Sequence, residues 1–316
     1  MAAFLVLILV LASSVANAGN LCPNFYENSC PQFESIVSNI VKIAVAQEVR
    51  MAAKLLHLHF HDCFVNGCDA SIALDDTPTF VGEKNASPNH NLSFGFEVIY
   101  DIKTHVEATC PGIVSCADIL ALAALDGVKE VGGPSWNLGF GRRDARTANK
   151  TEAERVFPKI NSTVAELIAI FSQQGLNARD MTALSGAHTI GAARCITFQK
   201  RIYNDKNINS SFAATRQETC PRIGGNSNIA PFDMQTPDIF DNQYYKNLVL
   251  QSGLLHSDQV LYDKGGSQVA LVNKYSTDQS AFFADFASAM TKMSNIRPLT
   301  GNDGEIRTDC TIINKI

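Results

Sequence analysis

The sequence predicts a mainly α-helical protein, and two observations support this. Apolar residues recur at spacings of three and four over most of the chain, as they do on amphipathic helices. Stretches with strand-like alternation are few and short. The 316 residues, 46% of them hydrophobic, suit one compact unit of two helical lobes. Long ordered loops rich in Gly, Pro and Asn are expected at residues 75–91, 132–148 and 221–241.

The expected helices follow in chain order. The first lies within Phe33–Phe60, which contains neither Gly nor Pro. Val114–Val131 has apolar residues at helical spacing, and Ser115 is a plausible N-cap because its hydroxyl can accept from the first free backbone N–H groups. Further helices are expected at Phe240–Gln251 and Ser280–Met293.

Two helices in the middle of the chain have start and stop signals. Thr163 and Glu166 have the spacing of a capping box before an apolar run, and Gly175 ends that helix. Either Asn177 or Asp180 starts the next helix, which we expect to run through the segment MTALSGAHTIG.

Residues 1–18 have the pattern of a secretory signal, which leaves one domain at 19–316. An apolar run is followed by Ala16-Asn17-Ala18, an A-x-A cleavage pattern, and the run is too short to span a bilayer. A buried hydrophobic strand is the alternative interpretation. No later segment is apolar enough to cross a membrane. The net charge of −5 and the scattered basic residues argue against a nucleic-acid partner.

Nine cysteines in a secreted chain predict disulfides, with one cysteine left over. Their spacing alone allows many pairings. The N-x-S/T sequons also fit an exported glycoprotein. They lie at Asn85, Asn91, Asn149, Asn161 and Asn209.

The segment LHLHFHDCF contains three histidines at alternate positions. On a helix His57 and His61 share a face, whereas His59 points elsewhere. The pair could hold zinc, although the Glu of the HExxH motif is missing; alternatively, one His is a general base, or each is a buried core residue. His188, in LSGAHTIG, and Asp258, in HSDQVL, fit a metal-ligating His and the carboxylate that accepts its second N–H.

Eight ordered segments resemble the secretory plant haem peroxidases, the horseradish-peroxidase-like family. They are LHLHFHDCFVNGCDASIALDDT, EKNASPN, CPGIVSCADILALAALD, GGPSWNLGFGRRDA, ALSGAHTIG, FDMQTPDIFDNQYY, GLLHSDQVL and LTGNDGEIRTDC. The resemblance covers nearly the whole chain after the signal. It implies an all-α fold whose distal and proximal lobes sandwich one haem b, two Ca²⁺ ions, and one-electron oxidation of phenolic donors by hydrogen peroxide. It also implies a monomer secreted to the cell wall.

On the proximal side the resemblance implies that His188 is the axial ligand of the haem iron. Asp258 matches the acceptor of its second N–H, and Phe232 matches the aromatic ring beside it. On the distal side, His61 matches the acid–base residue.

The remaining distal residues support His61 or shape the substrate path. Asn89 matches the residue that bonds the far nitrogen of the distal histidine, and Glu83 belongs to the same network and to the residues around the distal metal. Phe60 is expected to flank the peroxide pocket, and Pro158 matches the proline at the rim where aromatic donors bind.

Two calcium sites follow from the same resemblance. The distal ligands are expected to be side chains of Asp62, Asp69 and Ser71 and carbonyls of Val65 and Gly67. The proximal ligands are expected to be Thr189, Asp233, Thr236, Ile239 and Asp241. Taken alone, the distal loop also fits an ordinary turn with solvated carboxylates.

The family pattern pairs eight of the cysteines and leaves Cys22 unpaired. The implied pairs are Cys30–Cys110, Cys63–Cys68, Cys116–Cys310 and Cys195–Cys220.

His57 departs from the family, which has Arg at this position. Losing a fixed cation that stabilises a developing anion typically costs on the order of 10²–10³ in rate. Three interpretations of His57 follow. It partly replaces the Arg when it is protonated, or it indicates a weak or inactive haem-containing cell-wall protein, or it results from a single-base sequencing error. We favour a slower but real peroxidase, because the other distal and proximal residues are retained.

Overall fold

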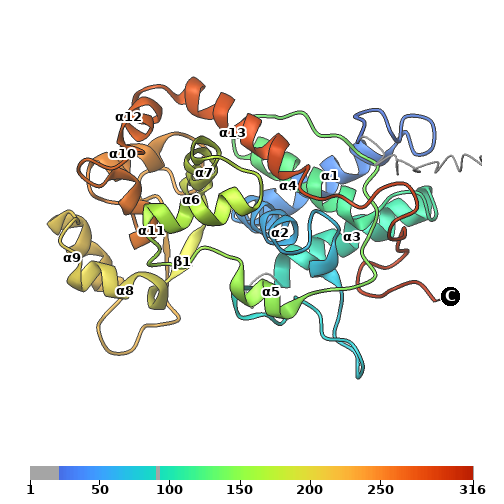
Figure 1. Cartoon of the computed structure of the whole chain (residues 1–316), viewed down its shortest axis with the longest axis horizontal. Coiled ribbons are helices and arrows are strands. Elements are labelled where there is room, and N and C mark those ends of the chain that lie inside the picture. The colour runs from blue at the N-terminus through green and yellow to red at the C-terminus, as the bar shows by residue number, and fades with distance from the viewer. Residues whose placement is uncertain (1–20, 90–92, 316) are drawn as a thin grey trace, which may run out of the picture.

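The computed structural model describes residues 21–89 and 93–315 and confirms the mainly helical fold (Figure 1). The secretory signal at residues 1–18 and the sequon at Asn91 lie outside the described residues. Within those ranges, no helix combines the length and the hydropathy that crossing a bilayer requires.

Thirteen α-helices make up most of the described chain. They are α1 (Phe33–Gln47), α2 (Met51–Val65), α3 (Ser93–Thr109), α4 (Cys116–Glu130), α5 (Lys150–Arg155), α6 (Val164–Gln173), α7 (Ala178–Ser185), α8 (Cys195–Asn204), α9 (Ser210–Thr219), α10 (Gln243–Val249), α11 (His256–Gln259), α12 (Val269–Thr277) and α13 (Gln279–Met293). Short 3-10 turns are η1 (Ser71–Ala73), η2 (Ser87–Asn89), η3 (Gly186–Thr189) and η4 (Val260–Tyr262). The two short strands β1 (Ala192–Arg194) and β2 (Ile229–Pro231) pair antiparallel.

The helices form two lobes around one main core. Helices α1 to α4 pack on one another at one side of the molecule, and α8, α9, α10 and α12 lie at the other (Figure 1). Helix α13 packs against α7, and its buried Phe282 and Phe286 belong to the same apolar cluster as Phe33 of α1. A smaller core lies under α8 and α9. The main core therefore continues from one lobe into the other.

The predicted helix starts are confirmed. The Ser115 hydroxyl accepts from the Asp118 N–H at 3.1 Å, and Thr163 and Glu166 form a reciprocal capping box. Asn177 caps α7, and Asp180 completes that capping box rather than starting the helix. These signals are local, so the sequence alone sufficed to place them.

Two boundaries differ from the prediction. The segment Phe33–Phe60 is broken at residues 48–50, where the Glu48 backbone is extended and its carboxylate pairs with Lys54 at 2.6 Å. The helix predicted through MTALSGAHTIG stops at Ser185 and continues as η3. Here the Gly186 N–H bonds to the carbonyls of Ala183 and Leu184, and the Tyr245 hydroxyl lies 2.8 and 3.2 Å from the carbonyls of Thr182 and Ala183.

The four disulfides join the pairs that the resemblance implies, and Cys22 is free and exposed. Cys116–Cys310 ties the start of α4 to the C-terminal segment, and Cys63–Cys68 closes the loop after α2. The other two close the α1–α3 region and the α8–α9 region.

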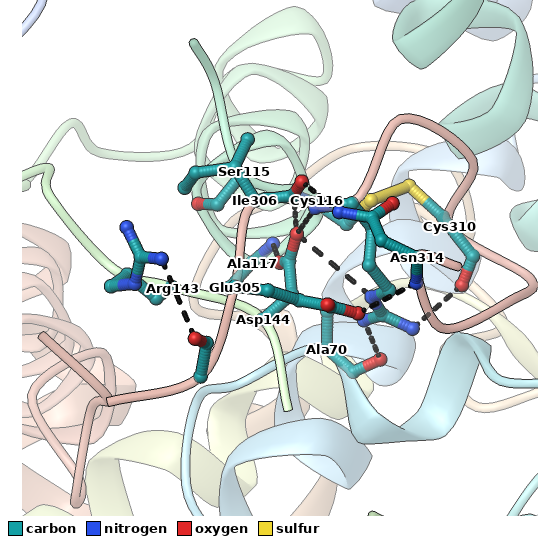
Figure 2. Close-up of polar contacts among 12 residues, drawn as sticks. Ala70, Ser115, Cys116, Ala117, Arg143, Asp144, Glu305, Ile306, Cys310 and Asn314 are labelled. Carbon is teal, nitrogen blue, oxygen red and sulfur yellow. Dashed lines mark hydrogen bonds and ion pairs between the residues drawn. A yellow bond between two sulfur atoms is a disulfide. The ribbon is translucent and has the colours of Figure 1, made fainter. Parts of the chain in front are cut away.

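A buried carboxylate fastens the C-terminal segment to α4 (Figure 2). Asp144 accepts from the first backbone N–H groups of α4, those of Cys116 and Ala117, at 3.1 and 2.9 Å, and from the Arg307 N–H at 2.9 Å. A negative charge is favourable at a helix N-terminus. The Arg307 guanidinium, also buried, donates onward to the carbonyl of Ala70 at 2.7 Å. The network thus connects α4, the C-terminal segment and the acidic loop after α2, which comprises residues 66–70.

We expect Asp144→Ala to lower the free energy of unfolding by about 3–5 kcal/mol, because it leaves a buried guanidinium and helix-terminal N–H groups unpaired. Urea unfolding followed by circular dichroism measures the change. Asp101→Ala is the matched control, since Asp101 pairs with His105 on the surface, and it should change stability by less than about 0.5 kcal/mol. Equal losses in both variants would contradict the assignment.

Candidate active site

Helix α2 places His57 and His61 one turn apart, as predicted, and the two imidazoles contact each other. The His57 Nε2 and the His61 Nε2 lie 2.7 Å apart, with the rings edge to face at 4.0 Å between centroids. The His61 side chain is buried, and its other nitrogen, Nδ1, lies 2.5 Å from the Asn89 Oδ1.

The neighbours of Asn89 fix the direction of each hydrogen bond in this chain. The Glu83 carbonyl can only accept, so the Asn89 Nδ2, 2.9 Å away, is the donor and the Asn89 Oδ1 faces His61. The His61 Nδ1 therefore carries the proton, and its Nε2 presents a lone pair. The His57 Nε2 must then donate to that lone pair.

Both imidazoles are held neutral. Burial, followed by the nearby His57, lowers the pKa of His61 well below its usual value, and only the bond to Asn89 opposes this. Burial, followed by the charge of His188, lowers the pKa of His57 to about 4. His57 nevertheless has accessible surface.

His59 points away from this pair, as predicted. It is buried, its Nε2 contacts the Ser294 Oγ at 2.9 Å, and burial together with the charge of Arg142 lowers its pKa to about 3. Its ring also lies beside the sulfurs of Cys63 and Cys68, but these form a disulfide and offer no thiolate. Among the described residues no third ligand joins His57 and His61, so the zinc interpretation gains no support.

Aromatic rings enclose the distal histidine. Phe157 stacks on His61 at 3.9 Å between centroids, and Phe60 lies at 5.3 Å. Pro158 follows Phe157 directly and is half-buried. The same loop reaches the other lobe, because the Ile160 carbonyl accepts from the Ser257 N–H at 3.1 Å.

The structure joins the predicted proximal residues. The His188 Nδ1 donates to the Asp258 Oδ1 at 2.8 Å, and Phe232 stacks on the imidazole at 4.1 Å between centroids. Asp258 is 4% exposed, whereas the His188 side chain is 37% exposed. The His188 Nε2 makes no hydrogen bond to any described residue. A buried carboxylate thus orients an imidazole whose second nitrogen is free.

The two lobes approach each other closely beside these imidazoles. Gly191, three residues after His188, has a positive φ of 88°, and a Cβ placed on it would lie 3.0 Å from the Ala53 Cβ of α2. The charge of His188 also depresses the pKa of His57. The free nitrogen of His188 therefore belongs to the same local environment as the α2 histidines.

The loop after α2 gathers the predicted distal acidic residues. Burial raises the pKa of Asp62 well above its usual value, that of Asp69 to about 6 and that of Glu83 to about 7. None of the three forms an ion pair with a Lys or Arg of the described chain. The Ser71 Oγ and the Glu83 Oε2 are buried without a hydrogen-bond partner in that same part of the protein. Missing positive charge and orphaned oxygens together fit a bound hard cation.

Arg297, near the C-terminus, contacts the two residues whose backbone carbonyls are expected to bind the distal ion, Val65 and Gly67. The Val65 carbonyl accepts from the Arg297 guanidinium at 3.3 Å. Gly67 has a φ of 134°, and a Cβ there would lie 2.4 Å from the Arg297 carbonyl. The carboxylates of Asp62, Asp69 and Glu83 do not all lie within 4.8 Å of one another.

The predicted proximal group is also assembled, through hydrogen bonds among its members. The Thr189 Oγ1 donates to the Asp241 Oδ1 at 3.2 Å, and the Thr236 Oγ1 donates to the Asp233 Oδ2 at 3.0 Å. Ile239 lies between them in the loop, with its side chain 53% exposed. One of these pairs joins η3, next to His188 in sequence, to the loop after β2, and the other lies within that loop.

Comparisons with known proteins agree with this geometry. A family model described as Peroxidase matches residues 37–278. The chain is 55% identical over 292 residues to Peroxidase P7 of Brassica rapa subsp. rapa, covering 92% of this chain and 98% of that protein. It is 53% identical over 301 residues to Peroxidase 4 of Vitis vinifera, covering 95% and 94%. It is 50% identical over 307 residues to the lignin-forming anionic peroxidase of Nicotiana sylvestris, covering 97% and 95%. The chain belongs to the peroxidase family and is a peroxidase.

Sequence reasoning missed two residues of the site. Phe157 stacks on His61, and Tyr244 donates to the Asp258 carboxylate at 3.1 Å. Neither has a local signal, because each contact joins elements far apart in the chain. Only the position of Phe157 next to Pro158 could have drawn attention to it.

Proposed function

We propose that this peroxidase binds one haem b between its lobes, that the His188 Nε2 would hold its iron, and that the enzyme uses hydrogen peroxide to oxidise phenolic donors. The observation that carries the proposal is His188 itself. Its Nδ1 is engaged by a buried carboxylate, whereas its Nε2 makes no hydrogen bond to a described residue, and His188 is near enough to His57 to lower the pKa of that residue. A metal-ligating His is typically arranged in this way. When bound, the haem supplies the iron and the redox capacity for reducing peroxide.

His61 is the proton carrier of the proposed mechanism. With its Nδ1–H held by Asn89, the His61 Nε2 would accept a proton from one oxygen of hydrogen peroxide and return it to the other, so that the O–O bond breaks and water leaves. The haem, when bound, would supply the two electrons that this cleavage requires. The depressed pKa of His61 keeps this nitrogen unprotonated at neutral pH. Phe157 and Phe60 limit the rotation of the ring and the access of water.

His57 slows this step for two reasons. It is neutral, so it does not supply the fixed positive charge that an Arg would place beside the developing anion. Its Nε2–H also occupies the lone pair that His61 needs for the peroxide proton, so His57 must turn away first. Slow peroxide activation in a real peroxidase follows from these contacts.

The proposed donor site is the rim at Pro158. The loop that carries Pro158 contacts the distal histidine through Phe157 and the proximal lobe through the Ile160 carbonyl. An aromatic donor at this rim is adjacent to both lobes. One relative is named a lignin-forming anionic peroxidase, and this chain is also anionic, with a net charge of −5. The name of that relative supports a phenolic substrate class.

Two Ca²⁺ ions complete the proposed holoenzyme. Asp62, Asp69, Ser71 and the carbonyls of Val65 and Gly67 would hold the distal ion, with Glu83 adjacent. Thr189, Asp233, Thr236, Ile239 and Asp241 would hold the proximal ion. Since each set adjoins a site histidine in sequence, calcium would stabilise the positions of His61 and His188.

We further propose that residues 1–18 direct secretion to the cell wall and that the domain at 19–316 acts there as a monomer. The four disulfides support an oxidising compartment. The described sequon asparagines Asn85, Asn149, Asn161 and Asn209 are all exposed.

The alternative function is a haem-containing wall protein with weak or no activity, and the observation that favours it is the bond between His57 and His61. Stopped-flow spectra of the purified holoprotein mixed with excess hydrogen peroxide separate the two proposals. A change in the haem spectrum that reverses on adding a phenol supports the peroxidase. An unchanged spectrum supports the alternative.

We expect His57→Arg to react with hydrogen peroxide at least about tenfold faster than the wild type, a scale set conservatively by the loss of a single donor to a developing anion. The second-order rate constant from stopped-flow mixing measures this. His57→Ala is the companion variant, because it frees the His61 lone pair without adding charge, and it should lie between the two. Equal rates for the wild type and His57→Arg would show that neither the charge of residue 57 nor its hydrogen bond to the His61 Nε2 limits the reaction.

The wild-type reaction is not expected to accelerate on acidification from pH 7 to pH 6. With a pKa of about 4, about a tenth of His57 is protonated at pH 5 and about a thousandth at pH 7. Rate constants from pH 5 to pH 8 test this, with His57→Arg as a control whose cation does not titrate in the range. A rise centred near pH 6.5 in the wild type alone would mean that the His57 imidazolium does assist.

Chelation of calcium should lower the Tm more at pH 7.5 than at pH 5. The pKa values of Asp69 and Glu83, about 6 and about 7, lie above their ordinary values near 4. Without a cation the folded protein therefore retains protons that the unfolded chain has released, and stability falls as the pH rises from about 4 to about 7.

Calcium offsets this loss only where the carboxylates are ionised. At 100 times Kd one ion contributes about 2.7 kcal/mol, or about 5 °C in a chain of this size. Calorimetry with EGTA, and again after restoring Ca²⁺, measures the shift. A decrease in Tm of the same size at both pH values would speak against carboxylate-bound calcium.

A further inference from the structure

The Asp258 carboxylate serves more than one donor. Its Oδ1 accepts from the His188 Nδ1 at 2.8 Å and from the Tyr244 hydroxyl at 3.1 Å, and its Oδ2 accepts from the Leu255 N–H at 3.1 Å. The oxygen that holds the imidazole is therefore shared with a phenol. This sharing is a feature of the proximal side that the proposed function does not use.

The Tyr244 hydroxyl donates to the Asp258 Oδ1 and to no other described acceptor. Its side chain is 4% exposed, and the Asp258 Oδ1 is the one acceptor that its hydroxyl reaches among the described residues. Burial, followed by the charge of Asp258, raises the pKa of Tyr244 well above its usual value, so the phenol stays protonated. Its ring is fixed edge-on against His188, at 6.3 Å between centroids, and against Tyr245, at 5.0 Å.

A second hydrogen bond to one carboxylate oxygen reduces the electron density that this oxygen offers to the first donor. The pull of Asp258 on the His188 Nδ1–H is therefore weaker than it would be for an unshared carboxylate, and the imidazole is less anionic. Partners of this kind tune the basicity of a ligating His and thereby the metal that it holds.

We propose that Tyr244 is a positioning residue that sets the basicity of His188 by competing with it for the Asp258 Oδ1. The inference rests on the proposed function, in which the His188 Nε2 binds the haem iron. Removing the phenol hydroxyl makes His188 a stronger electron donor and favours ferric over ferrous iron.

The neighbouring tyrosine offers a matched control. Tyr245 is also buried, and its hydroxyl also donates to acceptors on the protein, the carbonyls of Thr182 and Ala183 at 2.8 and 3.2 Å. It makes no hydrogen bond to Asp258 in the described structure. Tyr244→Phe and Tyr245→Phe each delete one buried hydroxyl, but only the first changes the carboxylate that orients His188.

The test is the ferric–ferrous midpoint potential of the holoprotein by spectroelectrochemical titration. We expect Tyr244→Phe to shift the equilibrium toward ferric iron at least about threefold, which is about 28 mV at 59 mV per tenfold for a one-electron couple. The iron–histidine stretching frequency of the ferrous protein should rise in the same variant. Tyr245→Phe should leave both quantities unchanged.

Replacement of Tyr244 by 3-fluorotyrosine is the second variant, because it keeps the shape of the side chain while making the phenol a stronger donor. It should shift the equilibrium in the opposite direction and thus tests the idea even where Tyr244→Phe fails to fold. Equal shifts in the two Phe variants, or a shift toward ferrous iron in Tyr244→Phe, would overturn the proposal. Absence of any iron–histidine band in the wild type would instead refute the ligand assignment of His188 itself.

Discussion

The hydrogen bond between the His61 Nδ1 and the Asn89 Oδ1 is the constraint on which the distal side depends. Its direction follows from the Glu83 carbonyl, which can only accept and so fixes how the Asn89 amide is turned. From this one fact the tautomer of His61 follows, then the lone pair on its Nε2, and then the role of His57 as a donor. Backbone geometry in the loop before η2 thus decides which atom of α2 can receive a proton.

The same loop region links the site to the rest of the fold. The Glu83 carboxylate accepts from the Asn149 N–H at 2.8 Å, while its second oxygen is unpartnered and close to the acidic loop after α2. The Arg307 guanidinium holds that acidic loop through the Ala70 carbonyl and belongs to the Asp144 network at the start of α4 (Figure 2). Buried polar groups, rather than apolar packing alone, therefore fix the loop residues that orient His61.

The sequence predicts those parts of the structure that depend on local chemistry. Ser115, and Thr163 with Glu166, cap their helices as expected, because a cap needs only the residues of one turn. The contacts at the end of α7 were not predictable, since they include the hydroxyl of Tyr245, which is 62 residues from Ala183 in the chain. For the site, the family resemblance predicted that Asn89 is a neighbour of His61 and that Asp258 is a neighbour of His188, and it showed that His57 is unusual. It could not show that His57 donates to His61, because that depends on how an amide 28 residues away is turned.

In each lobe an oxygen acceptor orients an imidazole, but the distal acceptor is a neutral amide and the proximal acceptor is a carboxylate. On each side an imidazole gives its Nδ1–H to an oxygen, so that its Nε2 carries the lone pair. The distal acceptor is the neutral amide of Asn89, which orients His61 without adding negative charge, so burial keeps its pKa low and the nitrogen ready to receive a proton. The proximal acceptor is the carboxylate of Asp258, which makes His188 electron-rich and suits it to hold a metal. Under the proposed function, the neutral amide thus accompanies the histidine that carries protons, and the carboxylate accompanies the histidine that holds the metal.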